Sequence, residues 1–317
     1  MLLFEMLLNS SAVETLNFGL FTGGRISTPT ILASTTKYTY SDDTVSAGTN
    51  LTTNTNFHGA AGTYDIGLFG GGAVQLNALV TTTYKYTYSG DTIAAGTDLL
   101  YARFSMGVTG TPTLALFAGG AINLGGVDPP ATANTCKYTY SGDTVSVGTS
   151  LSTAVRELAA TGTTTTGYFG GGAANNSTIY RTVSKYTYSG DSIVSGTNLT
   201  AARVLLSATG TSTVGYFGGG STLSAGTGYD TTATVYKYTY SGDTVASGTN
   251  LTISRYRAIA TGSKTIGYFC CGVISSSNYS NASSKYVYSN DTTASGTNLL
   301  YAVSGGAAPG SCPASFS

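Results

Sequence analysis

The stretch Lys185-Tyr186-Thr187-Tyr188-Ser189-Gly190-Asp191 decides the fold, because the chain repeats it almost unchanged. Its first four residues are Lys-Tyr-Thr-Tyr, a motif that also begins at Lys37, Lys85, Lys137 and Lys237, with Lys-Tyr-Val-Tyr beginning at Lys285. Successive copies are 48, 52, 48, 52 and 48 residues apart. Six copies of one unit therefore fill the 317 residues, with a period too long for most helical or leucine-rich repeats.

Each unit predicts four short β-strands, a to d, which we describe for residues 155–198. Strand a is the small-residue stretch 157–163, strand b is 166–169 and runs into three glycines, strand c is 183–188, and strand d is 192–196. In strand c the alternation places Tyr186 and Tyr188 on one face and Lys185 and Thr187 on the other. Four antiparallel strands with a period near 50 residues make one propeller blade.

The sequence therefore predicts an all-β fold, a six-bladed β-propeller that forms a single domain over residues 1–317. Strand a, rich in Ala, Gly and Thr, is expected next to the axis, where large side chains would collide. The N-terminus begins with a strand b at residues 19–24, and the C-terminus ends near a strand a at 307–311, so the two ends are expected to share one blade and leave no open edge. Residues 6–18 could also serve as that strand a.

The turn between strands c and d is expected to contain a residue with positive φ. Its middle position carries residues that tolerate a left-handed backbone: Gly90, Gly142, Gly190, Gly242, Asp42 and Asn290.

Composition excludes several functions. Fourteen basic and fourteen acidic residues leave no net charge, and no Lys/Arg cluster occurs, so nucleic acid is not an expected partner. No run of eighteen apolar residues occurs, so membrane insertion is not expected, and the opening MLLFEMLL makes a poor signal peptide. Cys136, Cys270, Cys271 and Cys312 lack metal-ligand spacing and are expected to be small buried residues.

Catalysis has few candidate residues, so we predict no enzyme, no catalytic residue, no metal and no cofactor. His58 is the only histidine, and it aligns with Leu158 and Leu206 of other copies, which favours a packing role on strand a. The acidic residues outside the repeat are scattered rather than paired. The Gly-Gly-Gly runs follow strands but precede no helix, unlike nucleotide-binding loops.

The variable part of each unit is the loop between strands b and c. From the last glycine of strand b to the next repeated lysine it spans 12, 12, 16, 12, 16 and 12 residues, which accounts for the alternating period. Loops on a rigid scaffold commonly carry binding residues, although these loops could also differ because nothing constrains them. The candidate ligand-binding residues come from the loops after Gly120, Gly172 and Gly220, and they are Leu124, Asp128, Asn175, Asn176, Tyr180, Arg181, Tyr229 and Asp230.

The repeated lysines and the aspartates that follow them carry twelve of the 28 charges. They could form a ring of ligand sites, but the favoured interpretation is cross-strand pairing inside each c–d hairpin. The aspartates are Asp43, Asp91, Asp143, Asp191, Asp243 and Asp291.

The order of features resembles the kelch repeat over nearly the whole chain. One copy has Ala202-Arg203 near the start of strand a, then Tyr216-Phe217-Gly218-Gly219, then a variable loop, then Lys237-Tyr238-Thr239-Tyr240. Kelch repeats usually carry a Trp in strand d, whereas this chain has none, so tyrosines are expected to fill the blade packing. Some kelch-type propellers are copper oxidases that need two histidines, which this chain cannot supply. The copied units are also similar to those of repetitive bacterial and phage fibre or appendage proteins.

These patterns favour a non-enzymatic binding or structural protein, a component of an extracellular or virion-associated appendage that contacts a surface. The expected partners are a surface glycan or protein receptor, or neighbouring subunits of the appendage. The alternatives are a soluble lectin-like protein that binds glycans through the loop face and, third, an enzyme on a propeller scaffold.

Overall fold

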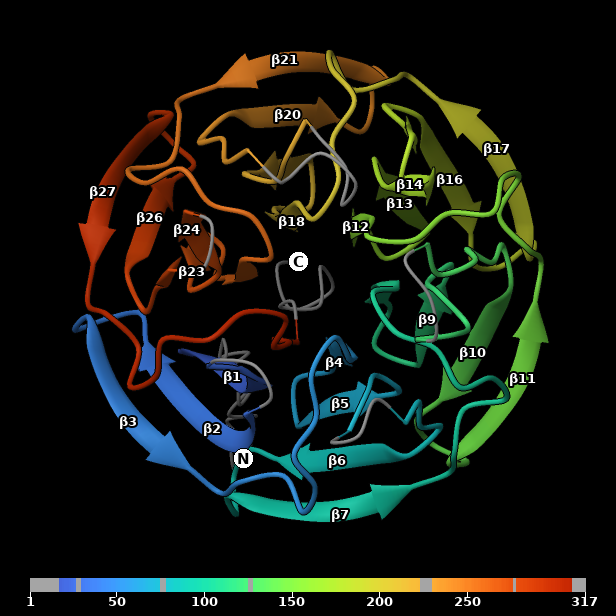
Figure 1. The fold of residues 1–317 in the computed structure, drawn as a ribbon, viewed down its shortest axis with the longest axis horizontal. Helices are drawn as coiled ribbons and strands as arrows, with labels where there is room; N and C mark the ends of the chain where they lie inside the picture. Colours follow the sequence, from blue (N-terminus) through green and yellow to red (C-terminus); the bar gives the residue numbers. More distant parts are fainter. Residues whose placement is uncertain are drawn as a thin grey trace, which may run out of the picture.

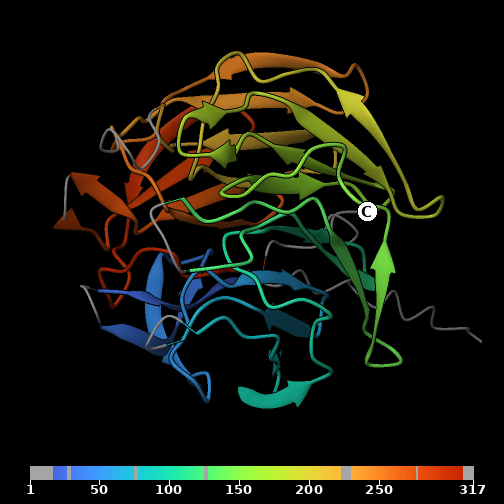
Figure 2. The same cartoon turned by 45° about the vertical axis from the view of Figure 1, so that its right-hand side comes forward.

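The chain folds into a six-bladed, all-β propeller, as the repeat predicts (Figure 1). The computed structural model describes residues 17–26, 30–74, 78–124, 128–222, 230–275 and 278–309. In Figure 1 the strand d of every blade lies on the outer circumference, and the inner strands β4, β12 and β18 lie near the axis. The oblique view of Figure 2 shows the strands in successive layers around the ring.

Five blades are four-stranded antiparallel sheets whose strands a, b, c and d follow one another in space. Blade 2 contains β4 (Gly59–Gly62), β5 (Ile66–Gly70), β6 (Thr83–Thr87) and β7 (Thr92–Gly96). Blade 3 contains β8 (Gly107–Gly110), β9 (Leu114–Ala118), β10 (Thr135–Thr139) and β11 (Thr144–Gly148). Blade 4 contains β12 (Ala159–Gly162), β13 (Thr166–Gly170), β16 (Val183–Thr187) and β17 (Ser192–Gly196). Blade 5 contains β18 (Ser207–Gly210), β19 (Val214–Gly218), β20 (Val235–Thr239) and β21 (Thr244–Gly248). Blade 6 contains β22 (Ile259–Gly262), β23 (Ile266–Cys270), β26 (Ser283–Val287) and β27 (Thr292–Gly296).

Two b–c loops contain a short hairpin of their own. In blade 4 the hairpin pairs β14 (Ala173–Asn175) with β15 (Thr178–Ile179), and in blade 6 it pairs β24 (Val273–Ser275) with β25 (Asn278–Tyr279). Since successive turns of a meander alternate between its ends, all b–c loops and all d–a connections share one face of the disc. We call this the loop face, and we call the opposite face, which carries the a–b and c–d turns, the turn face.

The C-terminal segment completes blade 1 and closes the ring. Blade 1 has β1 (Phe18–Arg25), β2 (Ile31–Thr39) and β3 (Thr44–Gly48). Thr22 and Ala307 exchange two backbone hydrogen bonds of 2.9 and 3.0 Å, and Arg25 and Ser304 exchange two more of the same lengths. The segment around residues 304–307 therefore takes the inner position of blade 1.

Tyrosine and phenylalanine fill the interfaces between blades, which confirms the packing expected from a chain without Trp. Tyr138 of blade 3, for example, packs in one cluster with Leu68 and Leu99 of blade 2 and with Phe117 of its own strand b. The first tyrosine of every repeat is fully buried, and so is nearly every strand-b phenylalanine. The free cysteines Cys136, Cys270 and Cys271 are buried as expected, whereas Cys312 lies outside the described residues.

The positive φ of the c–d turn was predicted at the wrong residue. It belongs to the aspartate that follows the predicted position, with φ of 44° to 55° at Asp43, Asp91, Asp143, Asp191, Asp243 and Asp291. The preceding glycines lie outside the left-handed region, and a Cβ added at Gly90 or Gly142 would meet nothing closer than 3.6 Å. The middle position therefore accepts Asp42 and Asn290 because it has room for a side chain.

The prediction that lysine and aspartate pair inside each hairpin is also wrong, because the pairs join neighbouring blades. Asp191 Oδ2 accepts a hydrogen bond of 2.6 Å from Lys137 Nζ in the preceding blade. Its Oδ1 accepts a bond of 2.8 Å from the backbone N–H of Thr149, also in the preceding blade, and another from its own Tyr186 hydroxyl. The ion pairs span 2.5 to 2.8 Å and close around the ring as Lys37–Asp91, Lys85–Asp143, Lys137–Asp191, Lys185–Asp243, Lys237–Asp291 and Lys285–Asp43.

Each aspartate is thus an acceptor at the blade interface, and we call these six residues the aspartate hubs. Hydrogen bonds from Lys85, Tyr138 and the Thr97 N–H lower the pKa of Asp143 from 3.8 to about 2. Burial works against the same shift at the other hubs, but the lysine and backbone hydrogen bonds outweigh it and lower their pKa values too. The hubs therefore stay ionised well below neutral pH.

Replacing Gly148 by Ala is expected to destabilise the fold by about 1 to 3 kcal/mol, because the new methyl group overpacks a blade interface. A Cβ at Gly148 would lie 2.8 Å from the Tyr186 hydroxyl and 2.6 Å from Thr135 Oγ1. The matched control Gly142→Ala, in the turn before the same strand, should change stability by less than about 0.5 kcal/mol. Urea unfolding followed by circular dichroism compares the two, and equal effects would contradict this account of the interface.

Acid is expected to lower the melting temperature mainly between about pH 4 and pH 2. The folded-state pKa of Asp143 is about 2 and the ordinary value is 3.8, so the unfolded chain binds protons first as the pH falls. The hub contribution is therefore complete above the ordinary pKa and is lost as the pH approaches the folded value. Thermal melts from pH 5 downward test this at roughly half-unit steps. An Asp191→Asn variant should show a shallower fall, and a pH-independent melting temperature in this range would refute the assignment.

Candidate binding site

Six residues, one from each blade, form a closed ring around the axis at the loop-face end of strand a. Each donates its backbone N–H to the carbonyl of its counterpart in the preceding blade, as Ser105 does to Phe57 at 2.9 Å and Glu157 to Ser105 at 2.8 Å. Phe57 donates to Gly305 at 2.5 Å, which closes the circle across the chain ends. We call these residues the axial ring, and they are Phe57, Ser105, Glu157, Leu205, Arg257 and Gly305.

All six axial-ring residues have a left-handed backbone, with φ between 53° and 66°. A residue other than glycine in this region costs of order 1–3 kcal/mol and persists only where the surroundings enforce it, most often at a functional site. Here the closed circle of hydrogen bonds enforces it. Five of the six residues carry a Cβ, so the left-handed backbone is strained at five positions and unstrained only at Gly305.

The repeated Gly-Gly motif of strand b makes room for the ring. Gly71 and Gly72 also have positive φ, and a Cβ at Gly72 would lie 2.6 Å from the Asn56 carbonyl oxygen. Strand pairing then resumes where Asn56 bonds to Ala73. The left-handed residues of the ring and of the Gly-Gly pair interrupt the regular pairing of strands a and b. Strand a is therefore shorter than predicted, and β12 begins at Ala159 rather than at Glu157.

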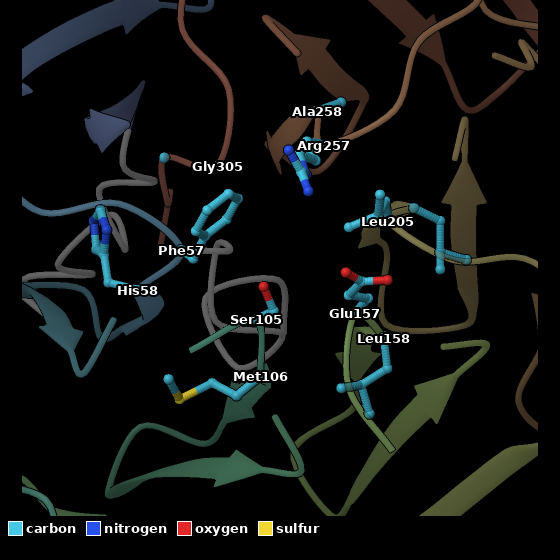
Figure 3. Close-up of a pocket in the computed structure, with 12 residues that line it drawn as sticks. Phe57, His58, Ser105, Met106, Glu157, Leu158, Leu205, Arg257, Ala258 and Gly305 are labelled. Carbon is cyan, nitrogen blue, oxygen red and sulfur yellow. The ribbon is translucent and has the colours of Figure 1, made fainter. Parts of the chain in front are cut away.

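The axial ring surrounds a small cavity of about 100 Å³ (Figure 3). The side chains of Phe57, Ser105, Glu157 and Arg257 extend from four different blades toward it. The residue after each ring position forms a second layer, and this layer comprises His58, Met106, Leu158, Leu206, Ala258 and Gly306.

Opposite charges face each other in this cavity. Burial raises the pKa of Glu157, while the positive charges of Arg257 and Arg156 oppose the shift. The Arg257 guanidinium lies over the Phe57 ring, 4.9 Å from its centroid, and 5.7 Å from the centroid of Tyr256. Cation–π contacts of this kind fix a guanidinium in place. The cavity therefore presents a carboxylate and a guanidinium that lies over an aromatic ring.

His58 has the packing position expected from its alignment with Leu158 and Leu206. Its Nε2 lies 2.9 Å from the Thr22 hydroxyl, and burial lowers its pKa to about 4. The imidazole is therefore neutral at neutral pH. In the part of the chain that the structure describes, no three His, Cys, Asp or Glu side chains gather as a metal-binding group.

The structure brings two of the predicted binding residues together, at the junction of the blade 3 and blade 4 loops. Arg156, whose side chain is 3% exposed, bonds Asp128 Oδ1 at 2.9 Å and Asn176 Oδ1 at 2.6 Å. The backbone N–H of Asn176 also donates to Asp128 Oδ1 at 2.9 Å. Arg156 directly precedes Glu157 in the chain, so the cluster of Arg156, Asp128 and Asn176 is connected to the cavity wall through Glu157.

The remaining predicted residues are spread over the loops, and none of those described lines the axial cavity. Asn175 Oδ1 caps its own hairpin by accepting bonds from Ser177 and Thr178, and Asp230 Oδ1 accepts from Ser221 and the Thr222 N–H. Leu124 and Tyr180 are half-buried, Arg181 is exposed, and Tyr229 lies outside the described residues. Their role in binding stays a prediction.

The axial ring was missed by the sequence reasoning, although a signal for it exists. In five copies the ring residue stands fourteen positions before the first residue of the Gly-Gly or Cys-Gly pair. At this position the copies carry Phe, Ser, Glu, Leu, Arg and Gly, so its residue type is not copied from blade to blade.

Comparison with known proteins adds no relative: no protein-family model matches this chain, and no curated protein matches it in sequence. The described residues also contain no helix of the length and apolar character needed to cross a membrane.

Replacing Ser105 by Gly should stabilise the protein by about 0.5 to 1 kcal/mol, since glycine adopts the left-handed conformation without a Cβ penalty. Ser105 has φ of 53°, and Gly305 already occupies the equivalent position in blade 1. The control Ser195→Gly, within the strand β17, should instead cost about 0.5 to 1 kcal/mol. Chemical denaturation of both variants measures the difference, and a destabilised Ser105→Gly would show that the ring is not strained.

Proposed function

We propose that this protein is a non-enzymatic binding protein whose loop face contacts a surface partner, and that it serves as a component of an extracellular or virion-associated fibre or appendage. The partner is a surface glycan or protein receptor, or a neighbouring subunit of the appendage. One observation carries the proposal. The differences among the six copies concentrate on the loop face, in the b–c loops and the axial ring, whereas the turns of the opposite face are nearly copied.

The rigidity of the scaffold supports a binding role. The aspartate hubs tie every blade to the next, and the axial ring ties all six blades together at the loop-face end. Loops anchored in this way lose little freedom when they bind, so less of the interaction energy is spent on ordering them. Such a part suits repeated contact with a surface.

The chemistry of the cavity favours binding over catalysis. Glu157 is the only carboxylate among the described residues that line it, so a pair of acids for glycoside hydrolysis does not converge there. The buried, neutral His58 is bonded to Thr22 and lies in the second layer of residues. These features support a site that holds a ligand without transforming it.

A kelch-like relationship and a similarity to fibre proteins belong to the same proposal. The arginine of the Ala-Arg pair in kelch-like copies has a structural place here, because fully buried Arg103 donates to the carbonyl oxygens of Phe117, Gly119 and Asn134. This arginine links the segment before strand a to strand b and to the b–c loop of its own blade. The Ala-Arg pair of the kelch-like order of features therefore helps to hold the blade together in this chain.

The test is density fractionation of the source material supplemented with tagged protein. We expect the wild type to co-sediment with particles or filaments in fixed stoichiometry, and Arg181→Ala on the loop face to reduce the bound fraction. Lys264→Ala serves as the matched control, because it removes an exposed cation from the turn face. A protein that stays soluble and monomeric would contradict the appendage role. A glycan screen would then test the lectin-like alternative.

A further inference from the structure

We propose that the outer rim of the propeller is a self-association surface, at which the outer strands of blades 3 and 4 pair antiparallel with the same strands of a second copy of this chain. These strands are β11 (Thr144–Gly148) and β17 (Ser192–Gly196), which follow one another along the circumference in Figure 1. The inference goes beyond the loop-face contact proposed above, because it concerns a different surface of the molecule and holds without that contact.

Every blade ends in an unpaired edge at the rim. In each sheet strand d is the outermost strand and pairs with strand c on one side only. Among the described residues, no backbone-to-backbone hydrogen bond joins a strand d to anything but its own strand c. Alternate N–H and C=O groups of an antiparallel strand point away from its neighbour, so each rim strand offers donors and acceptors to a further strand.

The rim strands lack lysine, proline and β-bulges, the features with which proteins usually protect such an edge. All six have five residues, an ordinary strand length, and contain only Thr, Ser, Ala, Val, Ile and Gly. Their pairing with strand c is continuous, without a shift of register. The repeated lysines of strand c are engaged by the aspartate hubs. A further strand can therefore approach the rim without displacing a charge.

Two exposed valines distinguish blades 3 and 4 from the others. Val147 in β11 is 58% exposed and Val194 in β17 is 55% exposed, more than any other large apolar side chain that the structure describes. The other copies carry Ala or Ser at the equivalent positions. Valine favours strand pairing, and covering an exposed valine removes apolar surface from water. The rim strands best suited to pairing are therefore β11 and β17.

Both strands are complementary to themselves. When β17 pairs with its own copy about a two-fold axis at Val194, this side chain lies beside the partner subunit's Val194. The same pairing of β11 about Ser146 places Val147 beside the partner subunit's Val145, on one face of the joint sheet. Fourteen acidic and fourteen basic residues leave no net charge with which two copies would repel each other. A second copy therefore fits this edge, and two such contacts per molecule allow chains of copies.

A single strand-to-strand contact is weak. One five-residue strand from each copy buries less than the area of about 1,200 Å² that a stable interface needs, so we expect a dissociation constant of about 0.1 to 1 mM. Contacts at two strands raise the effective affinity where many copies are gathered in one assembly.

The experiment is sedimentation velocity of the full chain from about 10 µM to about 1 mM, a range that includes this dissociation constant. We expect the average sedimentation coefficient to rise with concentration. Hydrogen exchange in the same samples should slow for the amides of residues 144–148 and 192–196 as the concentration rises. A protein that stays monomeric over the whole range, or one that associates without this protection, overturns the proposal.

Lysine variants test the two strands directly. Val147→Lys and Val194→Lys should each stop association at the dimer, because one of the two contacts remains. The double variant should weaken association about tenfold or more, since a charge on the edge opposes pairing.

The matched control is Ala47→Lys combined with Ala246→Lys, which adds the same charges at the equivalent exposed positions of β3 and β21. This control should associate like the wild type. Association that survives in the valine double variant, or that the control weakens equally, overturns the assignment to blades 3 and 4. Thermal melts verify that each variant is folded.

The two proposals fail separately. Arg181→Ala, which tests the loop face, should leave self-association unchanged. If the purified protein stays monomeric but still co-sediments with particles, the rim assignment is wrong and the surface role stands. If it self-associates through the rim but does not co-sediment, the appendage role is wrong and the rim contact stands.

Discussion

The structure depends on closure of the ring through the interfaces between blades. A blade of four short strands has two apolar faces, and only its two neighbours can bury them. The aspartate hubs hold each interface in register, because a single carboxylate accepts from a lysine and a backbone N–H of the preceding blade and, in most copies, from its own tyrosine. A half-exposed ion pair alone contributes little. The hub has more effect because it combines that pair with hydrogen bonds that a misplaced blade cannot make.

The same closure creates the candidate site. Five inner strands and the segment 304–307 of blade 1 reach the axis, and the residues that precede them are joined by hydrogen bonds that hold one residue per blade in a left-handed conformation. This geometry turns each of these side chains toward the axis. The scaffold therefore fixes the backbone from which the five side chains of the ring extend and leaves their chemistry open, which is why Phe57, Glu157 and Arg257 can occupy equivalent positions. Closure of the ring therefore accounts both for the repetition of the blades and for the freedom of the axial-ring residues to differ.

The loops have a different relationship to the scaffold. Asp128 and Asn176 meet at the buried guanidinium of Arg156, and Asn175 caps its own hairpin. Polar residues that look available in the sequence are thus partly engaged in holding the loops. This network also supports the axial ring, because Arg156 adjoins Glu157 and its charge opposes the rise in the pKa of that carboxyl.

Local pattern was enough to locate most of the strands. The predicted strand d, 192–196, and the first five residues of the predicted strand c, 183–188, coincide with β17 and β16, because alternation and turn residues act within a few positions of each other. The same pattern placed the positive φ one residue early, at Gly190 rather than Asp191. Asp191 is the last residue of the four-residue loop between Thr187 and Ser192, and the sequence pattern alone did not distinguish it from Gly190.

By itself, the sequence determined the number of blades, the strands within them and the face that varies, since these follow from the period and from residue types close together in the chain. Only the tertiary structure decided that Lys137 pairs with Asp191 across a blade interface, that the C-terminal segment closes blade 1, and that Glu157 and Arg257 share a cavity. Each of these pairings joins residues 54 to 285 positions apart. Their partners are chosen by ring closure, a property of the assembled blades that no single repeat contains.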